Sequence, residues 1–226
     1  MSILSPTQRT TVTRETKRAV AGRSRMLALL GDALVAHLGV VVVRDGVTHP
    51  VVLPIAFAVD PDGPDADGTL YLHGSTGSGW LRSALDTDVC VTVTELDGLV
   101  AARSGFSHSM NYRSAVVIGR ARVVDDPAER AHALDLIVDH MIPGRAATLR
   151  PPTRKELAAT AVLALPLREA SMKERAGGPE DEPEDVASGV WAGHIPLQRV
   201  ALPPVSAPDS HDEAPVDVVA RAEALG

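Results

Sequence analysis

The chain has 226 residues, with 22 Lys+Arg against 29 Asp+Glu and hence a formal net charge of −7. Its composition, 45% hydrophobic and 23% charged, is typical of a globular domain with one sizeable core, while the acidic balance excludes the basic stripe of a nucleic-acid-binding protein. The single cysteine, Cys90, excludes a disulfide framework and a multi-cysteine metal site, and no apolar run approaches the ~20 residues of a membrane helix. We expect a cytoplasmic protein with neither nucleic acid nor membrane as a partner.

The first predicted elements are helical. Apolar residues from Met26 to Leu38 recur at helical spacing, and Thr13 is a candidate N-cap. One or two amphipathic helices are therefore predicted over residues 14–37, and the basic residues of this segment are interpreted as a solvated helix face. Residues 1–36 are expected to form an N-terminal helical segment.

Strand patterns follow. Val40–Val43, the turn Asp45-Gly46 and Val51–Val59 predict a β-hairpin, because Asp-Gly between apolar runs favours a two-residue turn. A second hairpin turn is predicted at Asp97-Gly98, and a bend at Gly119 within a later strand. The remaining predicted strands are Thr69–Leu72, Val89–Leu96, Leu99–Arg103, Ala115–Val124, Ala161–Leu167 and Val190–Leu197.

Two further helices are predicted, one from Pro127 to about Met141 and one capped by Thr153. Gly177–Asp185 is an acidic loop by composition. Many strands with few helices favour an antiparallel β-barrel flanked by helices over a βαβ sheet. We expect the barrel to occupy residues 37–200 and residues 201–226 to be a disordered tail rich in Pro, Ala and Asp.

The strongest local signal for a ligand is the strand–loop–helix segment His73–Leu85. Its glycines allow backbone N–H groups to converge, the hydroxyls of Ser75, Thr76 and Ser78 add donors, and the helix that follows contributes its positive end. The segment therefore indicates a phosphate site, although it is not a P-loop. The alternative is a flexible connection with no ligand.

Two other segments are candidates. Arg113 and Ser114 stand at the start of an apolar strand, where a guanidinium at a barrel mouth binds phosphate; a surface arginine at a hairpin end is the alternative. Lys173 and Arg175 share a face if their segment is extended, and Trp191 is able to stack on a flat cofactor or to serve as a core or interface residue. Cys90 is interpreted as an inert thiol, and the scattered histidines predict no metal site.

The order of these motifs resembles the FMN-binding split-barrel superfamily. The segments that carry the resemblance lie between about Arg14 and Leu197: LYLHGS before a Gly/Ser loop, VCVTVTELDGLVAARS, SMNYRSAVVIGRARVVDD, SMKERAGGPEDEPED and VWAGHIPL. This is the pyridoxamine 5′-phosphate oxidase-like group, and the chain looks closest to its nitroimidazole-reductase-like flavoprotein branch.

The resemblance implies a mainly β fold with flanking helices, a six-stranded antiparallel split β-barrel, and a homodimer with FMN at the subunit interface. It implies that one group of residues holds the ribityl and phosphate, that a second lines the flavin, and that a third reaches the other subunit's site. These groups are His73, Gly74 and Ser75 with the following loop; Tyr112, Arg113 and Ser114; and Lys173 and Trp191.

One departure concerns the phosphate. Family members often have an Arg or Lys pair at the start of the helix after the loop, where this chain has Gly79 and Trp80. Arg82 or Arg113 is then the candidate to supply the missing charge.

We expect an FMN-dependent oxidoreductase acting on a small molecule such as a nitroaromatic or heterocyclic compound, with His73 as the residue nearest the reacting ring. For His73 the alternative is a strand-end histidine bonded to backbone. For the chain, the alternatives are a non-catalytic protein that binds haem or a deazaflavin on the same barrel, and a structural dimer with a vestigial pocket.

Overall fold

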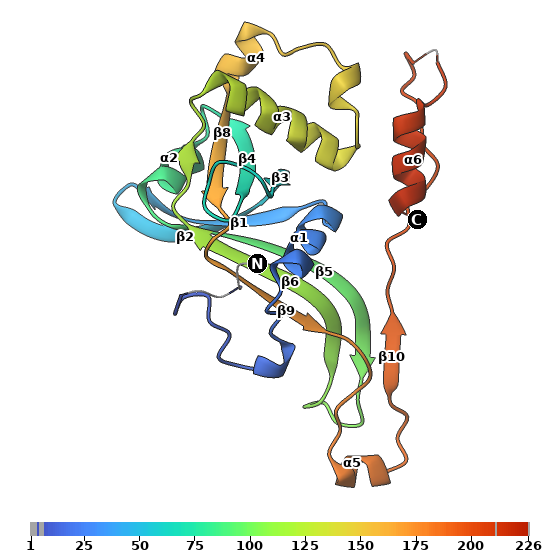
Figure 1. The fold of residues 1–226 in the computed structure, drawn as a ribbon. Coiled ribbons are helices and arrows are strands. Elements are labelled where there is room, and N and C mark those ends of the chain that lie inside the picture. The colour runs from blue at the N-terminus through green and yellow to red at the C-terminus, as the bar shows by residue number, and fades with distance from the viewer. Residues whose placement is uncertain (1–3, 5–6, 211, 226) are drawn as a thin grey trace.

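The structure is a computed structural model that describes residue 4, residues 7–210 and residues 212–225. Within these residues, ten strands form two antiparallel sheets, and helices pack beside them (Figure 1). The strands are β1 (Ala36–Arg44), β2 (Val47–Ile55), β3 (Phe57–Asp60), β4 (Thr69–Ser75), β5 (Val89–Ala101), β6 (Ser109–Gly119), β7 (Arg122–Val123), β8 (Thr160–Pro166), β9 (Ala170–Arg175) and β10 (Gly193–Pro196). The helices are η1 (Thr16–Arg18), α1 (Arg23–Asp32), α2 (Gly79–Asp86), α3 (Pro127–Met141), η2 (Ala146–Thr148), α4 (Arg154–Ala159), α5 (Pro183–Ala187) and α6 (Val216–Leu225).

The two sheets enclose the main core. One sheet has the order β2-β1-β5-β6-β9, with β10 also paired to β5, and the other has the order β3-β4-β8-β7. Leu38, Leu72, Val91, Val117 and Met172 are among the buried side chains that fill the space between them. The sheets do not close on each other by hydrogen bonds, so the fold is an open antiparallel barrel with flanking helices. The predicted split-barrel fold class is confirmed.

A second, smaller core lies under α3. Tyr71 of β4 and Val162 of β8 face away from the barrel and pack with Ile137 of α3. Figure 1 shows α3 crossing the end of the molecule where β4 and β8 stand, with α4 beside it. A large cavity lies within this layer of helix on sheet.

Elements with strong local signals form where they are predicted. Asp45 and Gly46 both have positive φ, 52° and 77°, as a two-residue hairpin turn between β1 and β2 requires. Thr153 and Glu156 make a reciprocal capping box at the start of α4. Pro127 begins α3 behind its N-cap Asp126, and β6 ends at Gly119.

The N-terminal helical prediction is wrong in extent. Only Arg23–Asp32 form an α-helix, preceded by the short η1, and Ala36 and Leu38 belong to strand β1. The two residues are buried at alternate positions because they face the barrel core from a strand. Their spacing fits a helix as well as a strand, and packing on the sheet decides between the two.

The predicted hairpin turn at Asp97-Gly98 is also wrong. β5 runs without a turn from Val89 to Ala101, and the two residues form a bulge against β6. Neither has positive φ. The reason is tertiary: β10 pairs with β5 at this point, and a Cβ on Gly98 would stand 2.9 Å from the carbonyl oxygen of Ile195. Gly98 therefore permits a close strand contact rather than a turn.

The segment predicted as a tail contains α6. Arg221 donates hydrogen bonds to the carbonyl oxygens of His140 (3.1 Å) and Met141 (2.8 Å) at the C-terminal end of α3. A guanidinium at this position satisfies carbonyl groups that have no partner inside the helix. In the part of the chain that the structure describes, no helix has the length and apolar character needed to cross a membrane.

Candidate functional site

A large cavity lies between α3 and the outer face of the β3-β4-β8-β7 sheet. It has a volume of about 930 Å³, within the usual range of ligand pockets. Leu134, Ile137, Val138 and Met141 of α3 form much of its wall, and Leu149, Pro151, Pro152 and Leu157 continue it through the loop and α4. The wall is mainly apolar, and His73 enters it from β4.

The imidazole of His73 is available to a ligand in this cavity. Its Nδ1 is buried and has no hydrogen-bond partner among the described residues. Burial lowers the pKa of His73, so the neutral imidazole is favoured at pH 7. A buried nitrogen without a partner is costly, and a neutral imidazole is the form that coordinates metal ions. The predicted alternative, a histidine bonded to backbone, is not what the structure shows at Nδ1.

Two other polar residues of the cavity wall, Arg150 and Glu156, are paired with each other. Arg150 and Glu156 line the cavity and form a two-point ion pair, at 2.9 and 2.7 Å, that together with the backbone of Thr153 lowers the pKa of Glu156 to about 2. Below the cavity, burial and a 3.0 Å hydrogen bond to Glu129 raise the pKa of Tyr71 to about 12. His73 thus brings to the cavity a buried ring nitrogen without a partner in the described structure.

The pleat of β4 separates His73 from the Gly/Ser loop. His73 faces the α3 cavity, and the next residue, Gly74, faces the opposite side of the sheet. There the indole of Trp80 occupies the space of a side chain, since a Cβ on Gly74 would stand 2.6 Å from Trp80 Cζ2. Gly74 therefore accommodates Trp80, and the residues predicted to hold one phosphate are divided between two faces.

Two hydroxyls of the loop have partners in the chain itself. Ser75 Oγ accepts from the backbone N–H of Gly77 (3.3 Å), and Thr76 Oγ1 lies 3.4 Å from the carbonyl oxygens of Ala158 and Ala159. Ser78 precedes α2 without a side-chain capping bond. These contacts hold the loop in place as a connection from β4 to α2.

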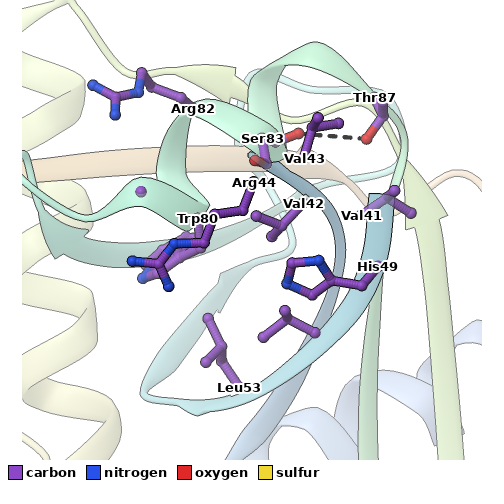
Figure 2. A pocket seen from close by; sticks show the side chains of 12 residues that line it. Val41, Val42, Val43, Arg44, His49, Leu53, Trp80, Arg82, Ser83 and Thr87 are labelled. Atoms are coloured by element: carbon purple, nitrogen blue, oxygen red, sulfur yellow. Dashed lines mark hydrogen bonds between the residues drawn. The ribbon is translucent and has the colours of Figure 1, made fainter. Parts of the chain in front are cut away.

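Arg82 lies at a different hollow, between α2 and the β1–β2 hairpin, which we term the hairpin hollow. Its volume is about 700 Å³. Figure 2 shows Arg44 extending toward Trp80 and His49 standing among the valines, whereas Arg82 extends outward from α2. The lining residues are Val41, Val42, Val43, Arg44, His49, Val51, Leu53, Gly79, Trp80, Arg82, Ser83 and Thr87.

The second predicted group lies on the β5-β6-β9 sheet and is itself divided. Tyr112 and Ser114 face away from the barrel core, and Lys173 of β9 is the register partner of Ser114. Ser114 Oγ is 3.0 Å from Thr94 Oγ1 on β5. The structure thus brings Tyr112, Ser114 and Lys173 to one face of the sheet.

Arg113 faces the other way. Its guanidinium bonds both carboxylate oxygens of Asp97 at 3.0 Å and reaches Asp32 at 3.3 Å, and these contacts raise its pKa. Its charge is therefore balanced by two carboxylates of its own chain. A smaller hollow of about 380 Å³ surrounds this group, lined also by Arg199 and Arg221.

The last of the predicted candidates is Trp191, which follows the acidic loop. Trp191 is 70% exposed, and its ring lies against Gly193. The loop before it is held by its own chain: Arg103 bonds the carboxylate of Asp181, and Arg175 donates to the carbonyl oxygen of Gly178 at 2.8 Å. Trp191 therefore stands apart from the cavity of His73.

Sequence reasoning missed Arg44, His49 and the apolar wall from α3. Arg44 directly precedes the Asp45-Gly46 turn and His49 follows it, so the hairpin pattern alone brings the two close together. The wall could not be found in the same way, because its residues fit an ordinary buried helix face.

Comparison with known proteins agrees with this architecture. The sequence model described as pyridoxamine 5′-phosphate oxidase matches residues 22–174, well over half of the chain. No curated protein matches the sequence closely enough to count as a relative.

Two solved structures are similar over nearly the whole chain. The flavocytochrome Anf3 from Azotobacter vinelandii is 37% identical, with 96% of this chain and 98% of that chain covered and a TM-score of 0.85. An FAD and haem binding protein from Mycobacterium smegmatis is 43% identical, with 89% and 95% covered and a TM-score of 0.78.

A third structure shares the fold. It is a suspected 5-nitroimidazole antibiotic resistance protein from Bacteroides thetaiotaomicron, 23% identical over 69% of this chain and 85% of that chain, with a TM-score of 0.54. Together with the matched sequence model and the open barrel, these likenesses place the chain: it belongs to the pyridoxamine 5′-phosphate oxidase family.

Proposed function

We propose that the protein binds a flavin and a haem and works as an oxidoreductase. The observation that carries the haem part is the buried, unpartnered Nδ1 of His73 at an apolar cavity of about 930 Å³. A haem needs a large apolar pocket and an axial ligand, and a neutral histidine is a common one. The relatives from A. vinelandii and M. smegmatis, whose descriptions name a flavocytochrome and FAD with haem, support the same assignment.

The residues of this chain have separable roles in the proposal. His73 is the candidate iron ligand; Leu134, Ile137 and Val138 exclude water from the pocket; and the pair Arg150–Glu156 supplies its polar lining. When bound, the flavin and haem would supply electron transfer, and the protein positions them and controls solvent access. FMN remains the predicted flavin by resemblance, and the description of the M. smegmatis relative makes FAD the form to compare with it.

The flavin site and the dimer are proposed together. Tyr112, Ser114 and Lys173 share the outer face of the β5-β6-β9 sheet, which is where the resemblance implies the flavin lies. The same face continues over β1 and β2 with exposed Val41 and Val52, an apolar surface that a second subunit would cover. A homodimer with the flavin between its subunits is therefore part of the proposal.

The first experiment is optical. The purified chain, reconstituted with hemin and then titrated with FMN or FAD, is expected to show a Soret band and quenched flavin fluorescence. The His73→Ala variant should keep flavin binding and bind haem at least tenfold more weakly, with a shifted Soret band, because the axial ligand is lost. His132→Asn is the matched control, since His132 also lies by this helix layer but bonds Asp60 at 2.8 Å.

The outcomes separate the two cofactors. A wild-type chain that develops no Soret band with hemin, or a His73→Ala variant with an unchanged spectrum, contradicts the haem site. A chain that leaves FMN and FAD fluorescence unchanged contradicts the flavin site. Oxidation of the reduced flavoprotein by a nitroimidazole, followed by the return of flavin absorbance, tests the proposed small-molecule substrate.

A further inference from the structure

The hairpin hollow has a lining suited to an anion. Arg44 is the register partner of Val47, and Val42 is the partner of His49, so all four side chains lie on the same face of the hairpin. That face packs toward α2, whose Trp80 and Arg82 complete the hollow. Figure 2 shows Arg44 and His49 on the hairpin beside Trp80, with Arg82 extending outward from α2 at the rim of the hollow.

Among the lining residues that the structure describes, none is acidic. The chain carries 29 Asp+Glu against 22 Lys+Arg, so a described lining with two arginines, a histidine and no carboxylate departs from the composition. Arg44 and Arg82 form no ion pair and no hydrogen bond with any residue that the structure describes. By contrast, the guanidinium groups of Arg113 and Arg122 are each held by two carboxylates.

Most of the remaining lining is apolar or aromatic. Val42, Val51 and Leu53 form a wall beneath the cations, and the indole of half-buried Trp80 adds a flat surface with one N–H donor. A simple inorganic ion would leave most of the roughly 700 Å³ unfilled. A ligand that combines an anion with a flat or apolar body matches both halves of the lining.

We propose that the hairpin hollow binds the diphosphate of a nucleotide, with Arg44 and Arg82 as the anion-binding residues and the valine wall with Trp80 beside the base or sugar. This places the charge that Gly79 and Trp80 lack on a neighbouring strand and one turn further along α2. Two sources share this chemistry: the diphosphate of FAD, in which case the inference rests on the proposed flavin site, and a separate nicotinamide dinucleotide that donates electrons.

The test uses the full chain without cofactor. Isothermal titration calorimetry with inorganic pyrophosphate and with ADP should detect binding that weakens as NaCl is raised, because the contacts are ionic. The double variant R44A/R82A should lose at least tenfold in affinity for both probes, since each arginine supplies charge-assisted hydrogen bonds. Arg154→Ala is the matched control, because Arg154 is an exposed arginine outside the hollow, and its affinity should stay within about twofold.

Either of two outcomes contradicts the proposal. No heat of binding for either probe at millimolar concentration overturns the proposal, as does an affinity that R44A/R82A leaves unchanged. The substitutions lie at exposed positions, and far-UV circular dichroism with thermal unfolding verifies that the variants fold.

A second titration distinguishes the two sources. If the hollow holds the flavin's own diphosphate, R44A/R82A weakens FAD at least tenfold, leaves riboflavin unchanged, and FAD prevents ADP from binding. If it holds a separate dinucleotide, FAD affinity is unchanged and ADP still binds the FAD-loaded chain. A chain that binds pyrophosphate and ADP but no flavin contradicts the proposed function while supporting this site, so the two failures are distinguishable.

Discussion

Two histidines are harder to protonate in the folded chain than in the unfolded chain. Burial lowers the pKa of His73 at the cavity and the pKa of His140, whose Nε2 is 2.7 Å from the carbonyl oxygen of Ala33 and whose ring packs against Phe57. In the unfolded chain both would titrate near the ordinary pKa of about 6.5. Acid is therefore expected to destabilise the folded chain at a pH above the range in which its carboxylates protonate.

The sign of the effect follows from proton uptake. Between the lowered folded-state pKa values and about 6.5, the unfolded chain binds more protons than the folded one, so the free energy of unfolding falls as pH falls. Urea unfolding at pH 7.5, 6.5 and 5.5 should show this loss, and His73→Asn should reduce it. His108→Asn, at an exposed histidine, should retain the full loss. Equal pH dependence in all three chains would contradict the assignment to His73.

At the scale of elements, β10 joins distant parts of the chain. Its four residues pair with β5, and Leu197 continues the contact by donating to the carbonyl oxygen of Asp97 at 3.0 Å. Asp97 also accepts hydrogen bonds from Arg113, so the bulge in β5 contacts both β10 and Arg113. The pairing depends on Gly98, because a side chain there would meet the backbone of Ile195.

We predict that Gly98→Val displaces β10 without unfolding the barrel. Overpacking of this kind costs about 1–3 kcal/mol, and we expect separation of the short strand from β5 to relieve it. Amide hydrogen exchange at Ile195 and Leu197 should become fast, while exchange in β6 stays slow. Gly105→Val is the control, since a Cβ on Gly105 meets nothing within 4 Å. Slow exchange at Ile195 in Gly98→Val would show that the strand tolerates the side chain.

At the scale of the whole molecule, one sheet face is left uncovered by the residues that the structure describes. Val41, Val43 and Val52 are 42%, 66% and 65% exposed and lie on the face of β1 and β2 opposite the barrel core. Leu96 of β5, 43% exposed, belongs to the same face. Exposed apolar surface of this extent on a sheet is typical of a protein–protein interface, and the proposed homodimer would bury it.

The dimer prediction has a matched pair of variants. Light scattering at micromolar concentration should give a mass near twice 23.7 kDa for the wild type. Val52→Arg should yield monomers, because a charge would be buried in the apolar interface. Val47→Arg should remain dimeric, since Val47 is 62% exposed on the opposite face of the same hairpin. A monomeric wild type would contradict the shared-interface flavin site.

The accuracy of the sequence predictions differs between the two Asp-Gly turns. At Asp45-Gly46 the signal is local and the hairpin is confirmed. At Asp97-Gly98 the same pair forms a bulge, because Ile195 lies almost a hundred positions further along the chain and pairs there. Arg113 shows the same limit among candidate site residues: its type indicates phosphate, yet Asp97 and Asp32 hold its guanidinium.

The sequence by itself determined the family resemblance, the open antiparallel barrel and the elements with local stop and start signals, such as α3 behind Asp126 and α4 behind Thr153. Such elements depend on residues within a few positions of one another, because local hydrogen bonds and backbone geometry set where each element begins and ends. Only the tertiary structure decided that His73 and Gly74 face different spaces, and that α3 walls the cavity of His73. A cavity is lined by segments distant in sequence, so its shape and its unpartnered groups exist only once those segments have packed.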